Sequence, residues 1–280
     1  MTIIVQSNIG GSGGSYVGPA DVATSPLGWW GLRAMSAAYA GGAAIDIVDS
    51  GNANAATINT LANGKLDEAT LATWITAHGT ASIKKIYDQT GGAKHLAQAT
   101  VANMPTIIQS ALGSLSCMSF VRASSQQLSV TSNYTISQPM TYSVVANRTG
   151  STSSQMCLLG NSNSQSEILF TTAATIDIYS TPGGGGVGMS PFTGGVADAT
   201  WLAVNALLNG ASSSAYVNGT NNGSLGAGTV AVSPTNVTSM GDDLSGNFLD
   251  GRMTEAGLWA ADKSSNFVAL NSNQRTYWGF

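Results

Sequence analysis

Acidic side chains are scarce in this sequence of 280 residues, which carries only 14 Asp and Glu residues. Glu167, in the run SQSEILF, is the one Glu in the β-rich middle of the chain, and Asp242 and Asp243 follow Gly241 at a turn. Hydrolysis of a glycosidic bond requires only two well-placed carboxylates. We expect carboxylates from these two segments to meet on the concave face of a sheet, and a retaining mechanism would place them about 5–5.5 Å apart.

The same residues also have plainer interpretations. Glu167 stands beside the apolar run Ile-Leu-Phe and could be an edge-strand residue that faces water. Asp242 and Asp243 could bind the backbone amides of their own turn, which is a common role of Asp at chain reversals. The acid–base hypothesis and these structural interpretations both stay open at this point.

A site that only binds sugar needs an aromatic face for stacking and a few side chains that make paired hydrogen bonds. The candidate aromatics, which we expect to be exposed on loops, are Tyr16, Tyr134, Tyr179, Phe192 and Phe248. The candidate polar partners are Asn161, Asn163, Asp242, Asp243 and Asn247. The alternative is that these aromatics belong to the core and the Asn residues fill turns. We expect the pair Trp29-Trp30 to be core.

Several other chemistries find no support in the composition. The chain has two His, no CxxC and no HExxH, so no metal-ligand spacing is present and no cofactor is indicated. Only 9% of residues are charged, against roughly 25% in an average soluble domain. The ten basic residues are scattered singly, which argues against nucleic-acid binding. Cys117 and Cys157 are expected to be two buried free thiols, with one disulfide as the alternative. No apolar stretch approaches the roughly 18 residues of a membrane span.

The fold prediction starts from the stretch between Thr200 and Gly219. An apolar run, Leu202 to Leu208, predicts a buried strand. Asn209-Gly210 breaks that run, and a second strand is predicted over Ser214 to Asn218 before another Asn-Gly turn. The stretch is therefore predicted to be a β-hairpin.

The rest of the chain supplies many short strands and few helices. Trp30, Met35 and Tyr39 are spaced as one helical face. Asp67 is the predicted N-cap of a helix over Glu68–Ala77, and a last helix is predicted over Ser264–Arg275. Strands are predicted over 43–48 and 82–87, and then, between turns rich in Gly, Ser and Asn, over 106–109, 115–121, 127–130, 141–148, 155–160, 166–171, 175–180, 237–241 and 251–259. We predict an all-β fold, a two-sheet antiparallel sandwich (jelly roll) with a few short helices, over residues 19–280.

Several motifs carry a resemblance to a known family. The pattern W-x-x-V-x11-Y-V-N-G of the hairpin resembles concanavalin A-like and laminin-G-like domains. The segments GLRAMSAAYAG, LDEATLATW, YDQTGG and F-x-x-G-x-M-T-x-x-G, with a terminal Y-W-G, are similar to the catalytic β-sandwich of B-type α-L-arabinofuranosidases. Related domains also occur in phage structural proteins. The resemblance covers roughly residues 26–280.

The resemblance implies roles for particular residues. Glu167 matches the family's nucleophile, and Asp242 stands in the turn that carries its general acid. The resemblance also favours the turn from Asp242 to Asn247 as a carbohydrate-binding site. The expected carbohydrate contacts are Asp242, Asp243, Asn247, Phe248 and Asn161. Some relatives hold Ca²⁺ in such loops, although no motif here indicates it. The adjacent Cys-Cys pair of those enzymes is missing, which puts the enzyme hypothesis in doubt.

Two functional hypotheses follow. The favoured one is a non-catalytic, lectin-like module displayed on a phage or phage-like particle as a fibre, spike or head-decoration protein, where it recognises a host glycan. Residues 1–18 would be a flexible arm that attaches it to other virion proteins, with homo-oligomers an open option. No signal peptide is visible, which suits a virion-surface or extracellular protein released by lysis. The alternative is a retaining glycoside hydrolase of α-L-arabinofuranosidase type.

Overall fold

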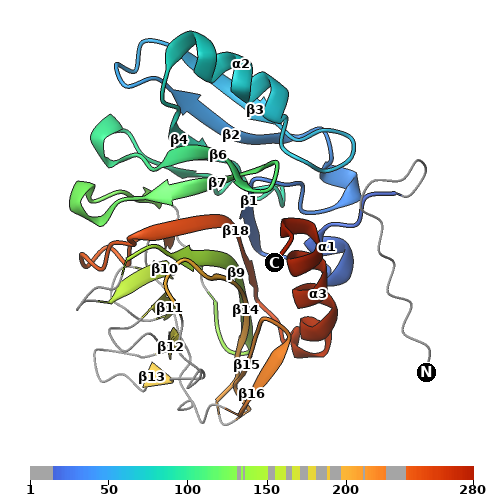
Figure 1. Cartoon of the computed structure of the whole chain (residues 1–280). Coiled ribbons are helices and arrows are strands. Elements are labelled where there is room, and N and C mark those ends of the chain that lie inside the picture. Colours follow the sequence, from blue (N-terminus) through green and yellow to red (C-terminus); the bar gives the residue numbers. More distant parts are fainter. Residues whose placement is uncertain are drawn as a thin grey trace.

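Antiparallel strands make up most of the computed structural model of this chain (Figure 1). The structure describes residues 15–130, 134, 136–150, 155–161, 166–170, 176–180, 188–189, 197–210, 212–224 and 238–280. The helices are α1 (Pro19–Val22), α2 (Glu68–His78) and α3 (Phe267–Trp278), with short 3-10 turns at Ala37–Tyr39, Val101–Asn103, Arg122–Ser124 and Ser264–Asn266. The strands are β1 (Gly28–Gly31), β2 (Ala43–Val48), β3 (Ala55–Asn59), β4 (Ser82–Ile86), β5 (Leu96–Ala97), β6 (Thr106–Leu112), β7 (Leu115–Phe120), β8 (Leu128–Ser129), β9 (Met140–Arg148), β10 (Met156–Asn161), β11 (Ser166–Phe170), β12 (Ile176–Ser180), β13 (Gly188–Met189), β14 (Trp201–Leu208), β15 (Ser214–Val217), β16 (Thr220–Ser224), β17 (Thr238–Met240) and β18 (Gly251–Trp259).

The strands form two branches that share β4. One branch runs β16–β15–β14–β9–β18–β7–β6–β4–β2–β3, with β1 added to the other end of β18. The other runs β13–β12–β11–β10–β17–β8–β5–β4. Every pair of described strands is antiparallel, and apolar side chains of both branches share one core cluster. The predicted all-β, concanavalin-like sandwich is confirmed.

The predicted hairpin at the centre of the fold is present. β14 pairs with β15, with Val204 opposite Val217 and Leu207 opposite Ser214. On its other side β14 pairs with β9 over eight consecutive residues. The apolar run predicted a buried strand here, and residues 202–208 are all buried, including the polar Asn205 discussed below.

Two helices cover the sheets, and both were predicted. Asp67 caps α2 as expected, because its carboxylate accepts a hydrogen bond from the Thr70 N–H at 3.0 Å. In Figure 1, α2 lies over β2 and β3, and α3 lies along β14 and β15. Trp278, at the end of α3, is 2% exposed and belongs to the main core, so it fastens the helix to the sheet as predicted.

The predicted helical face of Trp30, Met35 and Tyr39 is wrong. Trp29 and Trp30 lie in β1, which pairs with β18 through Gly28–Leu258 and Trp30–Ala256. Both Trp side chains are fully buried, as expected, and the Trp29 ring covers Gly257, where any side chain would collide with it. Burial of two large rings against β18 outweighs local helical spacing, since tertiary packing routinely overrides propensity.

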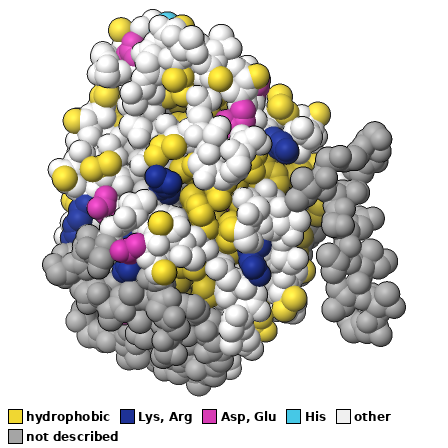
Figure 2. All heavy atoms as spheres, viewed as in Figure 1, with side chains coloured by type: hydrophobic (Ala, Val, Ile, Leu, Met, Phe, Trp, Pro, Cys, Tyr) yellow, Lys and Arg dark blue, Asp and Glu magenta, His cyan; other side chains and the backbone are white. Residues whose placement is uncertain are grey.

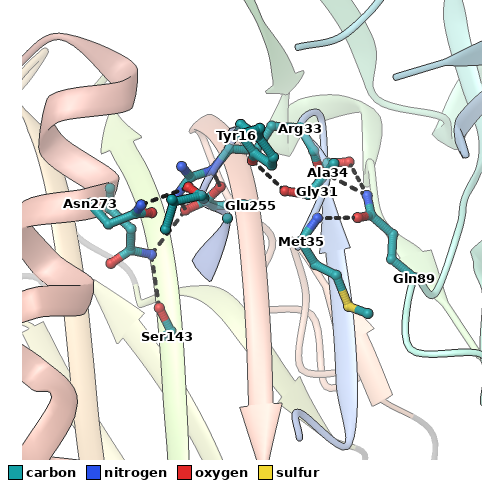
Figure 3. Close-up of polar contacts among 12 residues, drawn as sticks. Tyr16, Gly31, Arg33, Ala34, Met35, Gln89, Ser143, Glu255 and Asn273 are labelled. Atoms are coloured by element: carbon teal, nitrogen blue, oxygen red, sulfur yellow. Dashed lines mark hydrogen bonds and ion pairs between the residues drawn. The ribbon is translucent and has the colours of Figure 1, made fainter. Parts of the chain in front are cut away.

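A buried polar network joins α3 to the sheet and to the loop after β1 (Figure 3). Arg33 and Glu255 form an ion pair with two hydrogen bonds, of 2.6 and 2.8 Å, and both side chains are 0% exposed. Gln274 of α3 donates to Glu255 at 3.0 Å and to Ser143 of β9 at 2.9 Å. Asn205 of β14 donates in turn to Gln274 at 3.1 Å. These bonds offset most of the cost of burying the charges and amides, although Arg33 Nη1 and Asn205 Oδ1 have no partner among the described atoms.

Residues 15–18, the only described part of the predicted N-terminal arm, include Tyr16, which packs on the domain. The Tyr16 hydroxyl donates to the Ala34 carbonyl at 2.5 Å, and its ring meets Tyr277 edge to face at 6.3 Å (Figure 3). Burial raises the pKa of Tyr16 well above its ordinary value. Gly64 leaves room for this ring, because a side chain there would overlap it. Residues 1–14, including the apolar patch Ile3–Val5, lie outside the described residues.

Two further observations concern sequence predictions. Cys117 and Cys157 are both free and buried, which confirms the prediction of two separate thiols.

Within the described part of the chain, no helix has the length and apolar character to cross a membrane.

Candidate functional site

The structure brings Glu167 together with Asp242 and Asp243. Glu167 lies on β11, β11 pairs with β10, and β10 pairs with β17, which ends immediately before the Gly241-Asp242-Asp243 turn. Gly160 of β10 stands between them: a side-chain carbon placed there would lie 3.2 Å from the Glu167 Cβ and 3.5 Å from the Asp243 Cα. Because this central position has no side chain, carboxylates from non-adjacent strands can meet across it.

Backbone donors of the turn hold the two Asp side chains. The Asp243 carboxylate accepts hydrogen bonds from the N–H of Ser245 at 2.8 Å, the N–H of Asn247 at 3.3 Å and the Asn247 side-chain amide at 2.7 Å. Asp242 accepts from the N–H of Gly246 at 3.2 Å. The expected alternative role of these Asp residues, binding the amides of their own turn, is therefore present in the structure.

Burial and mutual repulsion shift the acidity of the cluster. Glu167, Asp242 and Asp243 are 3%, 1% and 0% exposed. Burial raises the pKa of Glu167 to about 8, and the charge of Asp243, a hydrogen bond with it and the charge of Asp242 act in the same direction. Burial and the neighbouring Asp243 likewise raise the pKa of Asp242 to about 6. At neutral pH the cluster therefore keeps a proton on Glu167.

Cys157 of β10 completes the surroundings of the cluster. Its thiol is fully buried, and its pKa is raised first by burial and then by the charges of Glu167, Asp243 and Asp242. The Asn247 carbonyl accepts a hydrogen bond from the Cys157 N–H at 2.8 Å, which ties the turn to β10. Glu167 Oε2 has no hydrogen-bond partner among the described atoms and is itself buried, so a ligand could reach this oxygen only after the cluster opens.

The turn does not fit the calcium site that the family resemblance allows. Calcium needs six to eight oxygen ligands, whereas the Asp243 oxygens here already accept three N–H donors. Among the described residues, no group of three or more His, Cys, Asp and Glu side chains is arranged to hold a metal ion. We therefore derive no step through a metal.

The other residues predicted to contact sugar do not gather into an aromatic face. Tyr134 is only 3% exposed and packs edge to face on Trp30, so its predicted exposure is wrong. Phe248 is partly buried beside the turn, and Asn247 serves the turn itself. The side chains of Asn161 and Tyr179, and the whole of Asn163 and Phe192, lie outside the described residues.

Sequence reasoning missed residues that shape this cluster. Gly160 looks like any other of the 34 glycines in the chain, and only the strand order reveals that it separates Glu167 from Asp243. Ser239 was also missed; its hydroxyl donates to the Asp242 carbonyl and fixes the start of the turn. Cys157 was expected to be buried but not to lie beside acidic groups.

Fold and cluster together define a concanavalin-like β-sandwich with a buried group of three carboxylates at the ends of β11 and β17. Neither a family model nor a curated protein matches the sequence. Solved structures do match. A GH54 α-L-arabinofuranosidase soaked with a cyclic sulfate inhibitor aligns with TM-score 0.61 and 15% identity. An arabinofuranosidase complexed with arabinofuranosyl-α-1,2-xylobiose aligns with TM-score 0.60 and 16% identity.

Both alignments cover 92% of this chain, and this chain spans 65% of the length of those structures. At such identity the likeness establishes the fold, which is the one that the sequence motifs predicted.

Proposed function

We propose that this β-sandwich hydrolyses a glycosidic bond, with Glu167 and the Asp242–Asp243 turn as its reacting carboxylates. The observation that carries the proposal is the contact of Glu167 with Asp243 across Gly160, with the pKa of Glu167 raised to about 8. Carboxyl groups whose environments separate their protonation states are what acid–base cleavage of a glycoside needs. The shared fold with arabinofuranosidases supports an arabinofuranoside as the first substrate to test.

The protonation state of the three carboxyl groups affects which of them can act as nucleophile and which as general acid. The family resemblance makes Glu167 the nucleophile and Asp242 the general acid. In the free protein, however, Glu167 holds the proton at neutral pH. A nucleophilic Glu167 must therefore pass that proton to its Asp neighbours when substrate binds, and the hydrogen bond between Glu167 and Asp243 provides a direct route.

Substrate entry requires the cluster to open. Hydrogen-bonded carboxyl groups are closer than the about 5–5.5 Å that a retaining reaction uses, and all three are buried. The Asp242–Asp243 turn must move away from Glu167 before a glycosidic bond can enter between them. Lid and loop movements of this kind commonly precede chemistry in enzymes.

The second candidate is a non-catalytic, carbohydrate-recognising module displayed on a phage or phage-like particle outside the cell. The burial of all three carboxylates favours it, because the cluster then simply stabilises the turn. In this candidate, residues 1–18 attach the domain to virion proteins or to further copies of itself. This part of the candidate derives from the sequence alone.

One assay separates the two candidates. The full chain is incubated with 4-nitrophenyl α-L-arabinofuranoside, and release of nitrophenol is measured. We expect turnover that Glu167→Gln and Asp242→Asn each reduce by about 10²–10⁴-fold, the usual contribution of acid–base groups. Glu68→Gln is the matched control, because burial also raises the pKa of Glu68, which is half-buried and bonds Ser116, away from the cluster.

Absence of turnover on arabinofuranosides and on a panel of other aryl glycosides would refute the hydrolase proposal. Saturable binding on a glycan array by such an inactive protein would favour the second candidate. Its attachment is tested by deleting residues 1–14, a cut that leaves the packed Tyr16 in place. The truncated domain should stay folded and no longer join its particle, and unchanged assembly would contradict this role of the arm.

A further inference from the structure

A groove of about 500 Å³ lies along α3, away from the carboxylate cluster. It is lined by Gly219, Val268, Asn271, Ser272, Arg275, Thr276, Gly279 and Phe280. Apart from Gly219 in the turn after β15, every lining residue belongs to α3 or follows it directly. None belongs to β10, β11, β17 or the Asp242–Asp243 turn. A volume of this size lies within the roughly 300–1,000 Å³ of small-molecule sites.

Two polar side chains of this groove have atoms without a hydrogen-bond partner. Asn271 is 0% exposed; its amide nitrogen donates to the Ala203 carbonyl at 2.8 Å, while its Oδ1 accepts no hydrogen bond in the described structure. Arg275 donates from Nη1 to the Asn218 carbonyl at 3.0 Å, while its Nε has no partner there. Unsatisfied polar atoms of this kind are costly, so a ligand that bonds to them gains affinity.

The glycine of the neighbouring turn keeps the space beside these two side chains open. Gly219 has φ +83°, and a side-chain carbon at this position would lie 3.4 Å from Arg275 Nη1 and 3.9 Å from Asn271 Oδ1. Any other residue would be strained there and would stand over both groups. Arg275 and Asn271 therefore both border the space that a side chain at position 219 would fill, and both line the groove.

The groove suits a neutral ligand better than an anion. Arg275 is the only charged residue of the lining, and no carboxylate of the described residues forms an ion pair with it. An anion would gain from that charge, but the groove also includes the C-terminal end of α3, where free carbonyls carry about half a negative charge. A hydroxyl group both accepts and donates, so it can bond Arg275 Nε and Asn271 Oδ1 without meeting this repulsion.

Apolar groups in the groove match the C–H faces of a sugar. Phe280 contributes an aromatic ring that stacks on Trp201 at 6.3 Å, and Val268 is 62% exposed. Figure 2 shows only scattered charged side chains on this face of the molecule. We propose that the α3 groove is a separate binding site for a neutral sugar residue, held by Arg275 and Asn271. This site is independent of the proposed glycosidase function.

The test follows the Arg275 side chain directly. Full-length protein with ¹⁵N-labelled arginine is titrated with methyl α-L-arabinofuranoside, with D-xylose and, as the anionic probe, with sodium D-galacturonate, while the Nε–H signal of Arg275 is recorded. Arg275→Lys keeps the charge and removes Nε, and its binding is followed by ligand-detected NMR. Arg122→Lys is the matched control, because Arg122 likewise donates Nη1 to a single backbone carbonyl. Thermal melting confirms that both variants are folded.

We expect a saturable shift of the Arg275 signal with at least one neutral sugar. Arg275→Lys should weaken binding about tenfold or more, as expected for loss of a charged hydrogen bond, and Arg122→Lys should leave it unchanged. Binding should also survive Glu167→Gln, which separates this site from the carboxylate cluster. No saturable shift with either neutral sugar, a shift with galacturonate alone, or equal loss in both Arg variants would each overturn the proposal.

Discussion

The buried ion pair between Arg33 and Glu255 allows one quantitative prediction. Glu255→Gln keeps the size of the side chain and its hydrogen bond from Gln274 but removes the charge that Arg33 faces. Both side chains are 0% exposed, so water cannot replace the lost partner. Breaking a buried pair in this way costs about 3–5 kcal/mol of unfolding free energy.

Urea denaturation at pH 7 measures this cost, and thermal melting provides a second readout. With roughly 2–4 °C per kcal/mol for a domain of this size class, the midpoint should fall by roughly 6–20 °C. Lys85→Gln is the control, since it breaks the more exposed pair between Lys85 and Asp46, 34% and 20% exposed. Exposed pairs contribute about 0–1 kcal/mol.

A double variant tests the reason for the effect. Arg33→Met with Glu255→Leu removes both charges and should recover much of the stability lost in Glu255→Gln, because no unpaired charge is left inside. The reasoning would be refuted if Glu255→Gln cost no more than Lys85→Gln. It would also be refuted if the double variant were clearly less stable than the single one.

Two further predictions concern the carboxylate cluster. Burial raises the pKa of Glu167 from 4.5 to about 8, so the contribution of this carboxyl group to stability is complete below pH 4.5 and is lost as the pH rises through 8. Urea midpoints measured from pH 5 to 9 should therefore fall more steeply for the wild type than for Glu167→Gln. Parallel profiles of the two proteins would contradict the pKa shift. Gly160→Ala places a methyl group 2.7 Å from the Cys157 Sγ and should cost about 1–3 kcal/mol by overpacking. Gly51→Ala, where the nearest atom is 3.7 Å away, is its control in the same denaturation assay, and equal costs would count against the packing argument.

The hairpin and the helix that begins after Asp67 could be predicted because their signals are local. The apolar run, the alternating residues of the second strand and the two Asn-Gly turns between Thr200 and Gly219 specify strand, turn and strand within one stretch of chain. Asp67 acts on the N–H of Thr70, three residues away. The secondary structure around Trp30 was predicted wrongly, as helix in place of strand, because the partner strand β18 lies more than 220 residues further along the chain.

The candidate site could be predicted only in part, because some of its residues carry a signal in the sequence and others depend on strand order. The scarcity of acidic residues together with the family resemblance pointed to Glu167 and Asp242–Asp243, and the structure brings them together. The place of Gly160 between them depends on strand order, which no local pattern reveals. The Arg33–Glu255 pair, 222 residues apart in sequence, and the two unpartnered groups of the α3 groove were likewise invisible without the fold.

The pairing of β1 with β18 has a consequence for synthesis of the protein. Gly28 and Trp30 pair with Leu258 and Ala256, so β1 has no neighbouring strand until more than 220 further residues have been synthesised. Contacts between such distant segments slow folding, because a long loop must close before they form. Until then Trp29 and Trp30 lack the strand against which they are buried in the folded protein, so the unfinished chain exposes two large apolar rings.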